Sequence, residues 1–143
     1  KLLYSNFMVH KGEHVGRSER TMIYDLFKAK PYCTTVTLTP NWRKPFVEYM
    51  KEAAEFKFTL APEGDQHDTY RVWEALSVGS IPITHTSPLD GIFADMPVII
   101  VDDYNVITED YLNAKYEEMK NKRYNLEKLY MRYWVNLINS KKI

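Results

Sequence analysis

Three polar side chains near the middle of the chain have types and spacing that suit the binding of an anion. Asp68, Arg71 and Glu74 stand three residues apart, after an apolar run ending at Ala61 and a polar loop containing Gly64. The amino end of a helix carries unpaired N–H groups and a partial positive charge, so it attracts anions. An arginine there can clamp a diphosphate, and a nearby carboxylate can accept two hydrogen bonds from a ribose diol. The pattern therefore indicates a nucleotide site, with Asp68 expected to cap the helix.

The same spacing also fits a purely structural role. Arg71 and Glu74 at positions i and i+3 suit a surface ion pair worth only a few tenths of a kcal/mol, and Asp68 is then no more than a helix cap. The sequence contains no glycine-rich dinucleotide or phosphate-loop motif, which argues against a nicotinamide site and an ATP phosphate-loop site. The residues alone leave the binding role and the structural role open.

The elements that position these side chains are expected to alternate between short β-rich runs and helical segments. We expect strands over 2–9, 33–38, 57–61, 81–85 and 97–101, and helices over 18–30, 45–56, 69–78 and 88–94. This alternation predicts an α/β fold with a Rossmann-like parallel sheet of about five strands and helices on both faces. In such a sheet ligands bind beyond the carboxyl ends of the strands, where the loop before Asp68 is expected to lie.

The 143 residues predict a single domain, with an α/β core over 1–107 and helices over 108–143. Gly79 is expected to end the helix over 69–78 in a left-handed conformation. From Thr108 onwards, apolar and aromatic residues recur every three or four positions, which predicts a buried stripe on amphipathic helices. These residues are Tyr111, Leu112, Tyr116, Met119, Leu126, Leu129, Tyr130, Tyr133, Trp134, Leu137 and Ile138.

Composition excludes several classes of protein. Nineteen basic and nineteen acidic residues give a formal net charge of zero, so we expect neither nucleic acid nor an anionic membrane surface as a partner. The apolar runs are far shorter than the roughly 18 residues of a membrane span. The single cysteine, Cys33, cannot form an internal disulfide.

The central motifs resemble the C-terminal, donor-binding half of exostosin-like glycosyltransferases, which have the GT-B fold. The resemblance covers about residues 56–112 and depends on the order of five short segments. These are FTLAPEG (58–64), DTYRVWEAL (68–76), GSIPI (79–83), SPLD (87–90) and MPVIIVDD (96–103). A receiver-like signalling domain is a weaker alternative, because its acidic cluster does not follow the first expected strand.

The resemblance implies transfer of a sugar from a nucleoside-diphosphate sugar to a glycan or another hydroxyl acceptor. The alternative is a non-catalytic module or subunit that binds a nucleotide sugar and needs a partner domain. Arg71 is expected to stabilise the leaving diphosphate, and Glu74 to face the ribose. One of Arg17 and Arg20 is expected to add a second phosphate-binding cation, although a solvated helical turn would also explain that pair. The other expected donor-site residues are Glu63, Gly64, Asp68, Thr69, Tyr70 and His85.

The resemblance also implies that no cofactor is needed beyond the donor substrate. We expect no metal site, because Asp102 and Asp103 are adjacent on an extended strand and point in opposite directions. GT-B enzymes take the acceptor's base from the N-terminal half, so a missing N-terminal domain or a homodimer is the expected partner. The resemblance suggests the cytoplasm for a microbial or viral protein and the Golgi lumen for an excised eukaryotic domain.

Overall fold

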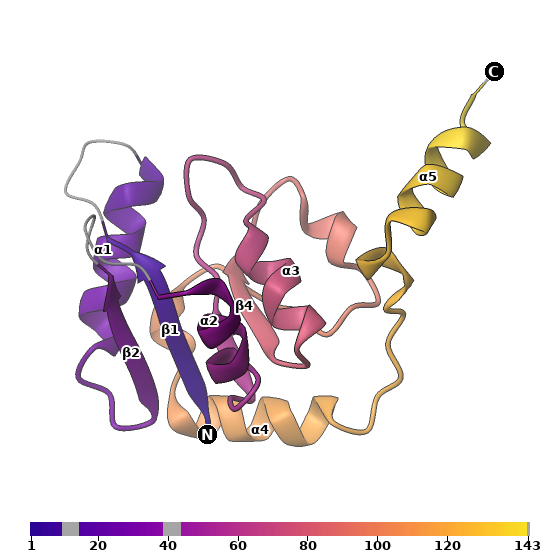
Figure 1. The fold of residues 1–143 in the computed structure, drawn as a ribbon. Coiled ribbons are helices and arrows are strands. Elements are labelled where there is room, and N and C mark those ends of the chain that lie inside the picture. Colours follow the sequence, from indigo (N-terminus) through magenta and orange to yellow (C-terminus); the bar gives the residue numbers. More distant parts are fainter. Residues whose placement is uncertain (10–14, 39–43, 143) are drawn as a thin grey trace.

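The sheet consists of five short strands that all run in the same direction. In the computed structural model, which describes residues 1–9, 15–38 and 44–142, they are β1 (Leu3–Met8), β2 (Cys33–Leu38), β3 (Phe58–Leu60), β4 (Ile81–His85) and β5 (Ile99–Val101). Their order across the sheet is β2-β1-β3-β4-β5, and every neighbouring pair is parallel. The expected α/β fold with a five-stranded parallel sheet is confirmed (Figure 1).

Helices cover both faces of this sheet, as expected. The α-helices of the described residues are α1 (Val15–Phe27), α2 (Phe46–Ala53), α3 (Tyr70–Ser77), α4 (Glu109–Met119) and α5 (Met131–Ser140). Short 3-10 turns are η1 (Asp90–Phe93), η2 (Tyr104–Val106) and η3 (Glu127–Leu129). Successive residues of a strand point to opposite faces, so each strand supplies side chains to two different cores.

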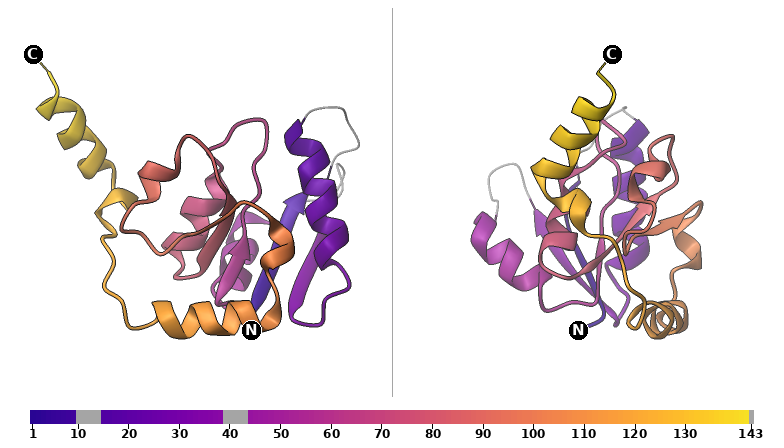
Figure 2. Two further views of the ribbon diagram at one scale, coloured as in Figure 1. Left: turned by 180° about the vertical axis from the view of Figure 1, so that it is seen from behind. Right: turned by 90° about the vertical axis from the view of Figure 1, so that its right-hand side faces the viewer.

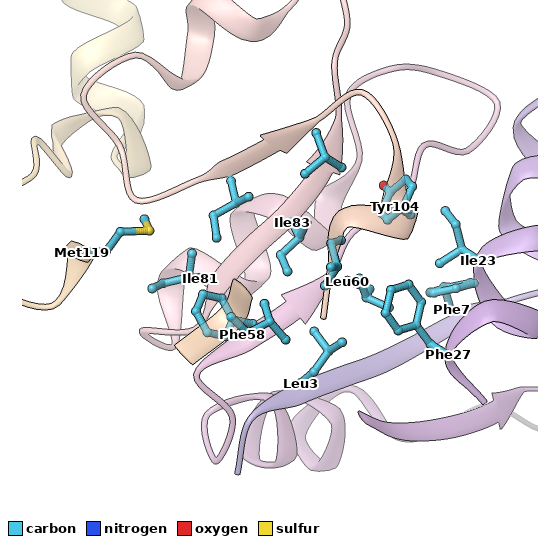
Figure 3. Packing of buried hydrophobic residues seen from close by; sticks show 14 residues of the cluster. Leu3, Phe7, Ile23, Phe27, Phe58, Leu60, Ile81, Ile83, Tyr104 and Met119 are labelled. Carbon is cyan, nitrogen blue, oxygen red and sulfur yellow. The ribbon is translucent and has the colours of Figure 1, made fainter. Parts of the chain in front are cut away.

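On one face, Leu3 and Phe7 of β1 pack in a large cluster with Ile23 and Phe27 of α1 (Figure 3). The same cluster takes in Phe58 and Leu60 of β3, Ile81 and Ile83 of β4, and Leu112 and Met119 of α4. On the other face, Tyr4 of β1 packs against Tyr49 and Ala53 of α2, and Val72 and Leu76 of α3 form a further cluster with Ala61. The two layers fix α1 and α3 on opposite sides of the strands whose carboxyl ends they follow.

The two C-terminal helices lie in different surroundings. In Figures 1 and 2, α4 runs beside the amino ends of the strands, whereas α5 extends away from the sheet. None of the residues of α5 is buried, and Ile138 has 62% of its surface exposed. The expected buried stripe is therefore present on α4, where Leu112 and Met119 are buried. The same expectation is wrong for α5. Within the described structure, no element packs along the apolar face of α5.

Local contacts still attach the start of α5 to the body. The ring of Trp134 meets that of Trp73 on α3 edge to face, with 6.3 Å between the ring centroids. The Trp134 indole N–H donates to the carbonyl of Lys128 at 2.9 Å. Lys128 in turn donates to the carbonyls of Ile92 and Ala94. The first turn of α5 is thus held against α3, and the rest of the helix extends beyond it.

Among the described residues, no helix combines the length and the apolar composition that a membrane crossing requires.

Candidate functional site

The strand order creates a topological switch point at the carboxyl edge of the sheet, between β1 and β3. The chain leaves β1 towards β2 on one side, and β3 lies on the other side of β1, so the connections after β1 and β3 diverge. In open α/β sheets, ligands bind outside the carboxyl ends of the strands at such a switch point. Of the described segments, the loop from β3 to α3 starts there, and α1 follows β1 in the chain. The loop from β3 to α3 and the helices α1 and α3 contain most of the side chains that the sequence singled out.

The helix that carries Arg71 begins one residue later than its expected cap implies. The N-cap of α3 is Thr69, whose hydroxyl accepts a hydrogen bond from the backbone N–H of Arg71 at 3.4 Å. The expectation that Asp68 caps this helix is therefore wrong. Asp68 Oδ1 instead accepts a hydrogen bond from the indole N–H of Trp73 at 2.9 Å. The orphan N–H groups of the first turn still face the carboxyl edge of the sheet.

Arg71 reaches from α3 to the end of β1. Its Nε donates to the backbone carbonyl of Asn6 at 2.5 Å, which ties the side chain to the switch point. Burial lowers the pKa of Arg71 from its usual value, while the neighbouring Tyr49, Glu74 and Tyr4 act in the opposite direction. A guanidinium group stays charged at neutral pH all the same. Among the described residues, Nε is the nitrogen of the Arg71 side chain that donates a hydrogen bond.

Arg20 approaches the same point from α1. Its Nε donates to the backbone carbonyl of Glu63 at 2.7 Å, and its guanidinium group lies over Gly64. Burial lowers the pKa of Arg20, and the positive charge of Arg71 is the next largest cause of the lowering. The carboxylates of Asp65 and Glu19 raise the pKa of Arg20 and oppose this effect, so Arg20 lies near both a second cation and two carboxylates. An anion placed between the two guanidinium groups would interact favourably with both.

The sequence left the choice between Arg17 and Arg20 open. Arg17 belongs to α1, but its side chain lies outside the part of the chain that the structure describes. Arg20 is the one of the two whose contacts with the β3–α3 loop are described. We therefore carry Arg20 forward as the second cation of the site.

Two buried tyrosine hydroxyls flank the arginines. In the described structure, the hydroxyls of Tyr49 and Tyr104 are buried and have no hydrogen-bond partner. Burial raises the pKa of Tyr49, which Arg71 lowers and Glu74 raises, so its hydroxyl lies beside both groups. Tyr104 lies on the other side of the sheet, where Glu19, Glu63 and Arg20 influence it. Buried hydroxyls are normally bonded, and the polar groups nearest to these two are the carboxylate of Glu74 for Tyr49 and the backbone at His85 for Tyr104.

Glu74 lies one turn beyond Arg71 on α3 and is half-buried. Its charge raises the pKa of both Arg71 and Tyr49, which places its carboxylate near both side chains. The structure thus brings Arg71, Glu74 and Arg20 to one region, as the sequence predicted for a donor site.

Of the remaining expected residues, some lie next to Arg20 and others lie elsewhere on the sheet edge or the surface. Glu63 and Gly64 lie beneath Arg20, and Glu63 Oε1 is 2.9 Å from Nδ1 of His67. His85 ends β4 with its ring nitrogens 3.1 Å from the carbonyl of Thr86 and 3.0 Å from that of Asp102. The neighbouring strand ends therefore hold the imidazole in place. Tyr70 lies apart from the arginines, with 86% of its surface exposed.

Sequence reasoning missed four residues of this region, namely Asn6, Glu19, Tyr49 and Tyr104. Glu19 is half-buried, and burial and then the charge of Glu63 raise its pKa, while His85 and Arg20 lower it. Carboxyl groups perturbed in this way gather at functional sites. The only signals in the sequence were the position of Glu19 next to Arg20 and a tyrosine on the apolar face of α2.

Replacing Gly64 with alanine tests the second arginine. A Cβ at position 64 would lie 2.8 Å from Nη2 of Arg20, so the guanidinium group must move aside, whereas the backbone needs no left-handed conformation there. We expect G64A to fold normally and to bind a nucleoside diphosphate about three- to tenfold more weakly, because the displaced guanidinium group keeps its charge and loses part of its hydrogen bonding, about 1 kcal/mol. Isothermal titration calorimetry measures this.

The matched control for this variant is Gly91→Ala, because nothing lies within 4 Å of a Cβ at position 91. G91A should bind like the unaltered protein. Equal affinity of G64A and G91A would show that Arg20 does not contact the ligand.

The fold and the site together define a class: a Rossmann-like α/β domain with converging cations at the switch point of a parallel sheet. A family model described as the RXYLT1 C-terminal domain matches residues 6–140, and the chain belongs to this family of exostosin-like glycosyltransferase C-terminal domains. The matched range starts at Asn6, whose carbonyl binds Arg71, and ends with α5. No curated protein matches the chain at a significant level.

Proposed function

We propose that this chain is the donor-binding domain of a glycosyltransferase and holds a nucleoside-diphosphate sugar at the switch point. The observation that carries the proposal is the convergence of Arg20 and Arg71, from α1 and α3, beyond the ends of β1 and β3. The family supports the same class of activity. The sugar would be transferred to a glycan or another hydroxyl acceptor.

The proposed chemistry uses the charges of the site. Breaking the bond from the anomeric carbon to the diphosphate places growing negative charge on the leaving phosphate, and positioned cations and N–H dipoles lower that barrier. Arg71, Arg20 and the first turn of α3 supply these groups. Glu74 would bind the ribose hydroxyls, and Glu63, Gly64 and Thr69 would line the approach of the donor. We propose that this arrangement works without a bound metal, as in other GT-B enzymes.

A second candidate is a nucleotide-sugar-binding module that needs another domain for turnover. The observation that favours it is α5, which exposes apolar side chains including Met131, Val135 and Ile138. We propose that an N-terminal domain or a second copy of the chain covers this face and supplies the acceptor's base. The two candidates share the donor site and differ in whether this chain alone releases nucleotide.

A ligand panel tests the proposed function. Thermal unfolding would be recorded with UDP, GDP and ADP and with their sugars, each with magnesium and with EDTA. At a concentration of 100 times Kd, binding adds about 2.7 kcal/mol, which corresponds to a shift of roughly 10 °C for a domain of this size. We expect one base to be preferred and the shift to persist in EDTA. Release of nucleotide on addition of acceptor sugars then separates the enzyme from the binding module.

The absence of a shift with all three nucleotides, on a sample whose unfolding is cooperative, would contradict the proposal. A thermal shift that is seen with magnesium but disappears in EDTA would support nucleotide binding and would contradict the proposal that no metal is needed.

A further inference from the structure

The carbonyl that holds Arg71 belongs to the end of β1, beyond the ladder that joins this strand to β3. That ladder covers Leu3 and Tyr4. Asn6 lies two residues further on, where it pairs with Val36 of β2 on the other side. Its carbonyl accepts a hydrogen bond from Nε of Arg71 at 2.5 Å. The position of the guanidinium group therefore depends on what holds this end of β1 in place.

A buried chain of hydrogen bonds holds Asn6 through its side chain. Residues two apart on a strand point to the same face of a sheet, so the side chains of Tyr4 and Asn6 are neighbours. Asn6 Nδ2 donates to the hydroxyl of Tyr4 at 2.8 Å, and this hydroxyl donates to Oε2 of Glu52 on α2 at 2.6 Å. Tyr4 and Asn6 are both buried. A buried polar network whose members are bonded to one another favours a single geometry.

The chain of hydrogen bonds ends on a charged group. Glu52 also accepts a hydrogen bond from Lys44, and this bond and then that from Tyr4 hold the pKa of Glu52 below its usual range. An ionised carboxylate only accepts hydrogen bonds, so the hydroxyl of Tyr4 gives its proton to Glu52 and offers a lone pair to Asn6. The direction of each bond is thus set from α2 towards the end of β1.

Aromatic packing holds the ring of Tyr4 but does not explain its hydroxyl. The ring stacks on Phe56 with 4.8 Å between the centroids, and on Tyr49 with 6.2 Å. A phenylalanine ring at position 4 would make the same stacking contacts. A buried hydroxyl costs free energy unless it is bonded, so the hydroxyl of Tyr4 contributes through its two hydrogen bonds.

We propose that Tyr4 and Glu52 are positioning residues for Arg71: they hold Asn6, whose carbonyl sets the direction of the guanidinium group. Neither side chain has to touch the ligand. Their hold on Arg71 can be tested on the free protein, whereas its consequence for affinity rests on the proposed function.

Two variants break the chain of hydrogen bonds at different points. Tyr4→Phe removes the hydroxyl and keeps the stacked ring. Its matched control is Tyr32→Phe, which removes a hydroxyl that donates to the carbonyl of Ile107 at 2.9 Å. Glu52→Ala breaks the chain at a partly exposed side chain of α2, so it replaces Y4F if that variant does not fold. Its control is Glu48→Ala, at an exposed position of the same helix.

The first measurement follows the Nε–H proton of Arg71 by NMR, without ligand. Its resonance is identified by its loss in Arg71→Lys. A hydrogen-bonded proton exchanges with water when the bond opens, so we expect exchange at least about fivefold faster in Y4F and E52A than in the unaltered protein. In Y32F and E48A it should stay within about twofold of the unaltered rate.

The second measurement is a double-mutant cycle on the binding of a nucleoside diphosphate, recorded by calorimetry. Y4F should weaken binding by about three- to tenfold, because Arg71 loses its fixed direction. R71K lacks the guanidinium group that Asn6 holds, so adding Y4F to R71K should change the affinity by less than about twofold. A role of Tyr4 in stability alone would not produce this dependence on residue 71.

Unchanged exchange of the Arg71 proton in both Y4F and E52A would overturn the proposal, and so would equal effects of Y4F and Y32F. A loss of affinity as large in R71K as in the unaltered protein would also overturn it, as would faster exchange with unchanged affinity. Failure of the proposed function would appear separately, as an absence of nucleotide binding to the unaltered protein. The exchange measurement would then still decide whether Tyr4 and Glu52 hold Arg71.

Discussion

Arg71→Met should weaken the binding of a nucleoside diphosphate by about 10- to 100-fold, because a charge-assisted hydrogen-bonding group contributes roughly 1.5–3 kcal/mol. Methionine keeps an unbranched side chain along the partly buried path of Arg71 but removes the donors and the positive charge. Arg71→Lys keeps the charge and loses the planar, forked guanidinium group, so its affinity for the nucleotide should lie between that of the unaltered protein and that of R71M. Calorimetric titration with the preferred nucleotide measures all three proteins.

Two controls make the Arg71 result interpretable. Arg123 is exposed, so Arg123→Met should bind nucleotide normally. Arg71 also donates to the carbonyl of Asn6, so denaturant unfolding of each variant must show that the fold persists. If R71M does not fold, the predicted loss of affinity is measured on R71K, which keeps the positive charge. Unchanged affinity in a folded R71M would remove Arg71 from the site.

Glu74→Gln should separate recognition of the ribose from recognition of the diphosphate. The carboxylate is expected to accept two hydrogen bonds from the ribose diol, so E74Q should bind the nucleoside diphosphate about tenfold more weakly. Inorganic pyrophosphate has no ribose, and the lost negative charge beside Arg71 should leave its affinity equal or higher. The two ligands therefore respond in different directions, and competition titration measures both.

The matched control is Glu48→Gln, since Glu48 is an exposed residue of α2. It should alter neither affinity. A loss of equal size for the nucleotide and for pyrophosphate in E74Q would mean that Glu74 acts by positioning Arg71. An unchanged nucleotide affinity would exclude contact with the ribose.

Local patterns predicted most elements of the fold closely. The expected strands over 33–38 and 81–85 coincide with β2 and β4, because apolar runs with turn residues at both ends mark buried strands. Gly79 has φ 80°, the left-handed conformation predicted for it. The order of the strands was not predicted, because periodicity reports which residues are buried and not which strands are neighbours.

Two local predictions failed for physical reasons. Asp68 and Thr69 both have side chains that can cap the start of α3. Thr69 is the cap in the structure, because the backbone places its hydroxyl near the N–H of Arg71 and the side chain of Asp68 accepts a hydrogen bond from the indole of Trp73 instead. The pattern of α5 is amphipathic, but a pattern does not provide the surface against which the apolar face packs. Ile138 is exposed because no described element covers it.

The candidate site was predictable only where its residues are close in sequence. Arg71 and Glu74 stand on one helix, so their spacing already placed them together. Asn6 is 65 residues from Arg71 and Arg20 is 43 from Glu63, and the sheet alone brings these pairs into contact. No pattern in the sequence indicated that Tyr49 of α2 belongs to the site, because its position beside Arg71 and Glu74 arises only in three dimensions.

The most direct measurement is a crystal structure of the chain with its preferred nucleoside diphosphate. The account predicts that the diphosphate lies beyond β1 and β3, with its oxygens about 2.7–2.9 Å from guanidinium nitrogens of both Arg20 and Arg71. A nucleotide bound elsewhere, with both arginines free of the phosphates, would contradict the account.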